Sequence, residues 1–199
     1  MEKSRITALA DGIFAVAMTL LVLDLKLPEG VKLSTDAEVW HQLVDLKSHF
    51  VTYGLSFVVL GTYWIGHHFQ FHFVRKVDRG FLGLNLLFLL FITLLPFSTN
   101  LLGGTHDLHV PVVVYGINLL LLSLLFLLNI RYLTRRPELC HEGFTPSQIT
   151  NYYRRSLLAV LILVASIAIS FYSPRVAVYA YLLLFAVHFL VARGDRHLN

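Results

Sequence analysis

The chain has 199 residues, of which 56% are hydrophobic and only 14% are charged, with a formal net charge of +4. Its mean hydropathy is +0.68. Soluble domains are about half apolar and roughly a quarter charged, so the composition predicts an integral membrane protein and excludes an ordinary soluble domain. The basic residues lie in short clusters between apolar runs, which argues against a nucleic-acid partner.

Six apolar runs predict membrane-spanning helices, because a bilayer core of about 30 Å needs roughly 20 apolar residues per helix. Residues 35–46, between the first two runs, are too polar to span and predict a short helix at the membrane interface, with Trp40 on its apolar side. The expected fold is therefore an all-α membrane protein, with one six-span domain over residues 1–199. The runs cover residues 6–27, 49–73, 81–102, 111–133, 155–172 and 175–193.

The positions of lysine and arginine predict the orientation, since cytoplasmic segments carry an excess of both. If both termini are cytoplasmic, only Lys26, Lys32, Lys47 and Arg175 lie outside. The other twelve are then inside: Lys3, Arg5, Arg75, Lys76, Arg79, Arg131, Arg135, Arg136, Arg154, Arg155, Arg193 and Arg196.

The first predicted helix carries Asp11 and Asp24 toward its two ends. At 100° per residue, Val16, Leu20, Leu23 and Leu27 fall on one narrow stripe, and Asp11 lies well away from it. Such a stripe is most often ordinary packing or lipid contact. It is also the pattern expected of hydrophobic rings that close a pore by excluding water. The spacing alone does not decide between these interpretations.

Polar residues of the first three predicted helices fall in the same half of the membrane. Ionisable groups at this depth are costly and are usually paired in the protein interior. We expect a structural network that joins the three helices, and a proton relay or gate sensor is the functional alternative. Its members are Arg5, Asp11, Trp64, His67, His68 and Asn85.

The sequence offers little support for catalysis or for a bound cofactor. His68 and His72 have the spacing of a histidine pair that binds zinc or haem, but no carboxylate or cysteine ligand accompanies them. Nucleophile motifs, phosphate loops and dinucleotide fingerprints are also missing. We therefore expect no enzyme activity, no metal, no cofactor and no small-molecule substrate.

Three segments carry a resemblance to a known family, the transmembrane protein 175 family of animal lysosomal potassium channels and their shorter prokaryotic relatives. The resemblance is specific over roughly the first 100 residues. The segments are Arg5-x-x-x-Leu9-Ala10-Asp11-Gly12-Ile-Phe-Ala-Val16-x-x-Thr19-Leu20-x-x-Leu23, then Trp64-Ile-Gly-His67-His68, then Leu84-Asn85 through Pro96-Phe97.

The resemblance implies a homotetrameric potassium channel in a lipid bilayer, here a prokaryotic cell membrane, with its pore lined by the first helix. By position, the hydrophobic constrictions of the family fall on Val16, Leu20 and Leu23, and its pore-side threonine falls on Thr19. Asp24 would lie near the outer mouth, where a carboxylate raises the local cation concentration. The family has Phe and Ser where this chain has Leu9 and Ala10, so contacts of that serine hydroxyl do not carry over.

Two other classes of membrane protein remain open. One is a proton-coupled secondary transporter or proton channel, and the other is a membrane redox protein. Transporters usually show broken helices in paired repeats and ionisable groups near the midplane. Apart from His188, this chain keeps its charges and imidazoles toward the membrane faces.

Overall fold

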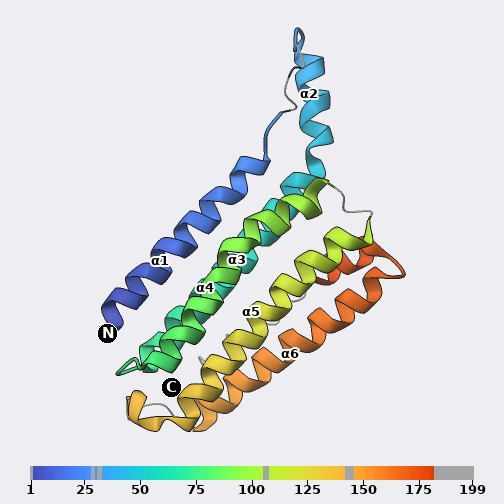
Figure 1. The fold of residues 1–199 in the computed structure, drawn as a ribbon. Coiled ribbons are helices and arrows are strands. Elements are labelled where there is room, and N and C mark those ends of the chain that lie inside the picture. The colour runs from blue at the N-terminus through green and yellow to red at the C-terminus, as the bar shows by residue number, and fades with distance from the viewer. Residues whose placement is uncertain (1, 28–29, 31–32, 105–107, 142–145, 182–199) are drawn as a thin grey trace.

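The computed structural model describes residues 2–27, 30, 33–104, 108–141 and 146–181. Every secondary-structure element named within these residues is a helix. Residues 174–181 are also helical. The helices named in Figure 1 are α1 (Lys3–Leu20), α2 (Asp36–Asp45), α3 (Lys47–Phe73), α4 (Arg79–Gly104), α5 (His109–Arg135) and α6 (Pro146–Ser170), with 3₁₀ turns η1 (Leu21–Asp24) and η2 (Pro137–Leu139).

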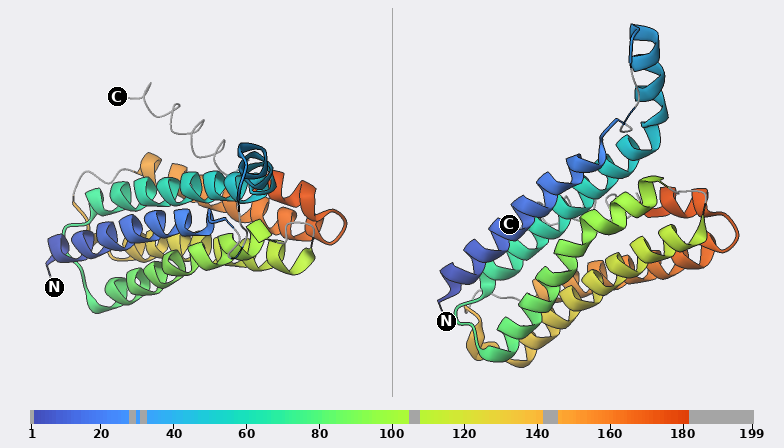
Figure 2. Two further views of the ribbon diagram at one scale, coloured as in Figure 1. Left: turned by 90° about the horizontal axis from the view of Figure 1, so that it is seen from above. Right: turned by 45° about the horizontal axis from the view of Figure 1, so that its top comes forward.

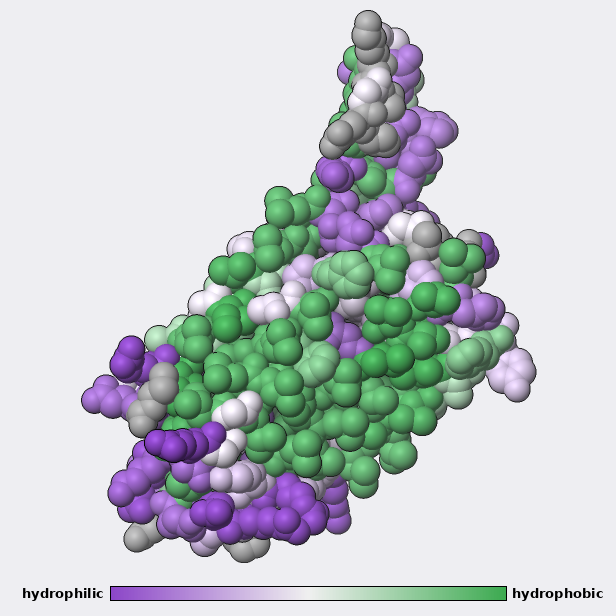
Figure 3. Space-filling model, in the orientation of Figure 1, coloured by the Kyte–Doolittle hydropathy of each residue, from purple (hydrophilic) through white to green (hydrophobic). Residues whose placement is uncertain are grey.

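Four helices are long and apolar enough to cross a membrane: residues Lys3–Asp24, Arg79–Gly104, His109–Arg135 and Gln148–Ser170. A fifth span is possible if α2 and α3, which are bent by 49° at their junction, count as one. An apolar band covers the bundle between a polar end and the projecting α2 (Figure 3). The chain is thus an all-helical integral membrane protein. Most of the sixth predicted span, 175–193, lies outside the described residues, so the six-span count stays a prediction.

The bundle is ordered so that α1 packs on α3 and α4, while α5 joins α4 to α6. α1 and α6 therefore lie at opposite edges (Figure 1). The core between α1, α3 and α4 contains large fully buried side chains, among them Phe14, Phe88 and Ile92. This arrangement fixes one face of α1 and leaves its other face at the surface of the subunit.

The predicted short helix is present as α2, which projects beyond the end of the bundle (Figure 2). Thr35 and Glu38 form a capping box, in which each side chain accepts a hydrogen bond from the backbone of the other. No residue of α2 is buried, and Trp40 is 70% exposed. Its position at the membrane interface stays a prediction.

Candidate functional site

α1 has two faces of different character. Its buried stripe is made of Ile6, Ala10, Phe14 and Ala17, and it is continued by Leu21 in η1. The stripe predicted for the pore lies on another side of the helix and is exposed, with 57% of Val16, 42% of Leu20 and 64% of Leu23 accessible in the subunit. The pore candidates are therefore not needed for packing inside one subunit.

The end of α1 tightens into the 3₁₀ turn η1, which the sequence did not predict. Side chains three residues apart eclipse one another in a 3₁₀ helix, so Leu20 and Leu23 stack more directly along the axis than a helical wheel indicates. Leu21 is fully buried, so it anchors the turn to the core. A polar residue at Leu21 would disturb folding and makes a poor control for the pore stripe.

Thr19 is exposed beside this stripe, and its hydroxyl donates to the carbonyl oxygen of Val16 at 2.8 Å. Because its proton is used within the helix, the oxygen has only its lone pairs left, which can accept a hydrogen bond. Thr19 thus offers an acceptor of the kind that suits a cation or its hydration water.

Asp24 lies at the last position of η1 and is tied to α4. The Asn100 side-chain amide donates to Asp24 Oδ1 at 2.5 Å, while Asp24 Oδ2 has no hydrogen-bond partner among the described residues. A hydrogen bond to a carboxylate is among the stronger contacts in proteins. Asn100 therefore joins α4 to the end of the first helix, a contact that sequence reasoning missed.

Four residues of the predicted polar network form two hydrogen-bonded pairs. The Trp64 indole N–H donates to Asp11 Oδ1 at 2.9 Å and so joins α3 to α1. His67 Nε2 lies 3.1 Å from Asn85 Oδ1 and joins α3 to α4. The His68 ring lies beside Trp64, with centroids 6.1 Å apart. The Arg5 side chain is exposed and has no ion pair within the described part of the chain.

His67 is buried and lies among aromatic rings of three helices. Its ring stacks on Phe71 with centroids 4.4 Å apart and on Phe88 at 5.8 Å, and Phe14 of α1 lies 6.0 Å away. Asn85 also donates to the Phe81 carbonyl oxygen at 2.9 Å and lies 3.5 Å from Asn129 Oδ1. These contacts fix the imidazole in place beside the anchored face of α1.

Replacing Trp64 with phenylalanine is expected to loosen α1 from α3. The change removes only the N–H donor and part of the ring, and a hydrogen bond to a charged group contributes about 1.5–3 kcal/mol. The midpoint of thermal unfolding in detergent should fall, whereas Trp40→Phe on the exposed α2 should leave it unchanged. Equal midpoints for the two variants would show that the hydrogen bond from Trp64 to Asp11 does not stabilise the subunit.

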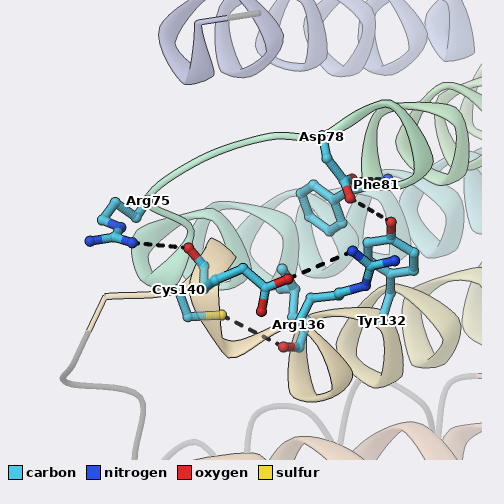
Figure 4. A network of polar contacts seen from close by, with 8 residues as sticks. Arg75, Asp78, Phe81, Tyr132, Arg136 and Cys140 are labelled. Atoms are coloured by element: carbon cyan, nitrogen blue, oxygen red, sulfur yellow. Dashed lines mark hydrogen bonds and ion pairs between the residues drawn. The ribbon is translucent and has the colours of Figure 1, made fainter.

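The end of the bundle that holds the N-terminus of α1 is closed by two loops joined side by side (Figure 4). Val74 and Cys140 form an isolated antiparallel bridge, and Arg75 donates its backbone N–H to Leu139 at 2.7 Å. Tyr132 donates to Asp78 Oδ2 at 2.6 Å, which lowers the pKa of that carboxyl.

A small apolar cluster beneath these loops holds Ile6 of α1 together with Phe71, Phe81 and Leu133. The two loops cover this cluster. They therefore help to fix the N-terminal end of α1, the helix that carries the candidate pore residues. Nothing in the sequence pattern indicated this contact, because each loop is short and polar.

No group of three or more histidine, cysteine, aspartate or glutamate side chains able to hold a metal ion occurs within the described ranges. The arrangement that remains is a helix anchored on one face, with an apolar and weakly polar stripe exposed on another.

Comparisons with known proteins place the chain in a family. The sequence profile described as "Endosomal/lysosomal potassium channel TMEM175" matches residues 5–96. The chain is similar in structure to the crystal structure of a lysosomal potassium-selective channel TMEM175 homolog from Chamaesiphon minutus, with a TM-score of 0.78 and 26% identity, over 95% of this chain and 97% of that chain.

The chain is also similar to the potassium channel HX13_20290 of Chryseobacterium sp. (strain P1-3), with 31% identity over 92% of this chain and 90% of that protein. It is 34% identical to the human endosomal/lysosomal proton channel TMEM175 over 49% of this chain and 20% of that protein. With a full-length relative above 30% identity and a matching profile, the chain belongs to the TMEM175 family.

Proposed function

We propose that the chain is one subunit of a passive potassium channel whose pore is lined by α1 of four copies. The exposed face of α1 carries this proposal. The apolar stripe lies on this face, and packing inside one subunit does not use it. One subunit supplies one such face, so a closed pore needs several copies around a symmetry axis. Relatives that span nearly the whole chain are named potassium channels, which supports potassium as the ion.

Val16, Leu20 and Leu23 form successive hydrophobic rings on the axis of this pore. An ion that passes them loses or distorts its hydration shell without a replacing oxygen ligand, and such constrictions gate by dewetting. Thr19 supplies an oxygen next to the rings. Asp24, with one oxygen held by Asn100 and one left unpartnered, attracts cations to the nearby mouth. No chemical step or cofactor is involved.

The proposed channel lies in a prokaryotic cell membrane with both termini in the cytoplasm and α2 outside. The excess of lysine and arginine at the end that holds the α3–α4 and α5–α6 loops supports this orientation. Asp24 then faces the outer mouth, and the Asp11–Trp64 pair lies in the cytoplasmic half of the membrane.

Ion flux from liposomes tests the proposal. Purified protein is reconstituted with potassium inside and sodium outside, and then with the gradients exchanged. The channel is expected to dissipate the potassium gradient faster than the sodium gradient, with no requirement for a pH gradient or a co-substrate. Flux only in the presence of a proton gradient would instead identify a proton-coupled transporter, and no flux of either cation would contradict the channel assignment.

A further inference from the structure

Three arginines lie on two neighbouring helices at the end of the bundle that holds the N-terminus of α1. Arg79 begins α4, and Arg131 and Arg135 lie in the last turns of α5. All three side chains are exposed, and none forms an ion pair within the described part of the chain. Exposed cations that lack acidic partners make a surface that attracts anions.

The acidic side chains of the neighbouring loops are already engaged by other groups (Figure 4). Asp78 Oδ1 accepts the backbone N–H of Phe81 at 2.8 Å, and its Oδ2 accepts the hydroxyl of Tyr132. Glu138 pairs with Arg136, with Oε1 and Nη1 3.6 Å apart. The three arginines therefore keep their charges for an anion from outside the subunit.

A close contact between α4 and α5 brings the arginines onto one surface. Gly80 packs directly against the Tyr132 hydroxyl, where a Cβ atom would clash, and the rings of Phe81 and Tyr132 stack with centroids 6.3 Å apart. Arg79 precedes Gly80, and Arg131 precedes Tyr132. Arg79 and Arg131 thus flank the same contact between the two helices.

An exposed apolar stripe runs along each helix from its arginines toward the middle of the bundle. At 100° per residue, the two arginines of α5 fall within about 60° of two exposed leucines, and the arginine of α4 falls within about 80° of two others. Residues so placed share one face of their helix. The α5 stripe is Leu124, Leu128, Arg131 and Arg135, and the α4 stripe is Arg79, Leu87 and Leu90.

The length of these stripes matches one leaflet of a bilayer. Leu124 lies seven residues from Arg131, and Leu90 lies eleven residues from Arg79, which at 1.5 Å per residue is about 10 Å and about 16 Å. Half of a bilayer core is about 15 Å thick. The apolar band of the bundle also ends in hydrophilic side chains at this end (Figure 3). The arginines therefore lie at the depth of lipid head groups and the leucines at the depth of acyl chains.

The opposite ends of the same two helices carry no such cations. α4 ends in Asn100-Leu-Leu-Gly-Gly104, and α5 begins with His109-Val-Pro-Val-Val113, with no lysine or arginine in either segment. The combination of arginines and exposed leucines on this face is thus confined to one leaflet.

We propose that this face of α4 and α5 binds an anionic phospholipid. Arg79, Arg131 and Arg135 hold the phosphate, because guanidinium groups match its geometry and bind it through charge-assisted hydrogen bonds. Basic surfaces between membrane helices bind anionic head groups in this way. The leucines of both stripes contact the acyl chains. In the orientation proposed above, the lipid belongs to the cytoplasmic leaflet, and its binding does not depend on which ion crosses the pore.

Native mass spectrometry of the full-length protein in detergent tests this proposal. The protein is titrated with phosphatidylglycerol and, separately, with phosphatidylcholine that has the same acyl chains. Wild-type protein is expected to bind phosphatidylglycerol more tightly. The double variant Arg131→Gln with Arg135→Gln should weaken phosphatidylglycerol binding by about thirtyfold, the combined effect of two arginines near an anionic lipid, and should change phosphatidylcholine binding little.

The double variant Lys76→Gln with Arg154→Gln is the matched control, because it removes the same charge from exposed positions outside the two stripes. It should bind phosphatidylglycerol as the wild type does. Arg131→Lys with Arg135→Lys keeps both charges and should keep most of the binding. If the glutamine pair does not fold, Arg79→Gln alone should weaken binding by about fivefold.

Three results would overturn the proposal. Equal affinity of the wild type for the two lipids would mean that no anionic head group is recognised. An equal loss in the control pair would assign the preference to overall charge rather than to this face. Displacement of the lipid by millimolar glycerol phosphate, the water-soluble part of the head group, would identify a phosphate site that makes no use of the leucines.

Discussion

Replacing Leu23 with serine is expected to raise the resting potassium flux by roughly tenfold, the change produced by a barrier about 1.4 kcal/mol lower. Serine is smaller than leucine and offers water hydrogen-bonding groups, so four copies would widen and hydrate the constriction. Leu23 is 64% exposed in the subunit, which means that its replacement removes little internal packing. Flux of potassium and sodium from liposomes measures both conduction and the loss of selectivity that should accompany it.

Val22→Ser is the matched control for this change. Val22 neighbours Leu23 in the same 3₁₀ turn and is also exposed, but it points away from the stripe of Val16, Leu20 and Leu23. Its replacement is expected to leave conduction near the wild-type rate. If Val22→Ser raised the flux as much as Leu23→Ser did, a general leak caused by a polar residue would explain both results and the pore stripe would be wrong.

Replacing Phe14 with alanine is expected to destabilise the subunit by about 3–5 kcal/mol, the usual cost of removing a large buried aromatic side chain. Phe14 is 1% exposed and joins α1 to α3 and α4 through His67 and Phe88. Its removal opens a cavity against the face that positions the pore helix. Thermal unfolding in detergent, followed by size-exclusion chromatography, should show a large fall in midpoint.

Phe97→Ala removes the same side chain from α4, where Phe97 is 64% exposed. This variant should unfold close to the wild-type midpoint. Similar midpoints for Phe14→Ala and Phe97→Ala would mean that the anchored and exposed faces of α1 are misassigned. The face of α1 proposed to line the pore would then be wrong too.

Hydropathy predicted the helices well because each span must hold its apolar residues in one continuous run. The predicted runs 81–102 and 111–133 lie inside α4 (79–104) and α5 (109–135), and the short polar helix near Trp40 is present as α2. The helical wheel also separated Val16, Leu20 and Leu23 from the buried face of α1. It missed the 3₁₀ turn, since the tighter winding depends on how Leu21 and Asp24 meet the rest of the bundle.

Contacts between helices were harder to predict than the helices themselves. Asp11, Trp64, His67 and Asn85 were grouped by depth in the membrane, and the structure places them in two pairs that depth alone does not distinguish. Asn100 was missed as the partner of Asp24 because the two residues are 76 positions apart and belong to different helices. Such pairs depend on helix rotation, which the hydropathy pattern of a membrane helix defines weakly.

Chemical modification of single cysteines on α1 tests the central claim most directly. Leu23→Cys and Val22→Cys are prepared in a Cys140→Ser background, which removes the one native cysteine. If the α1 stripe lines the potassium pore, a charged thiol reagent will block potassium flux through Leu23→Cys and leave flux through Val22→Cys unchanged. Full potassium flux through a channel whose Leu23→Cys thiols have all reacted would contradict the account.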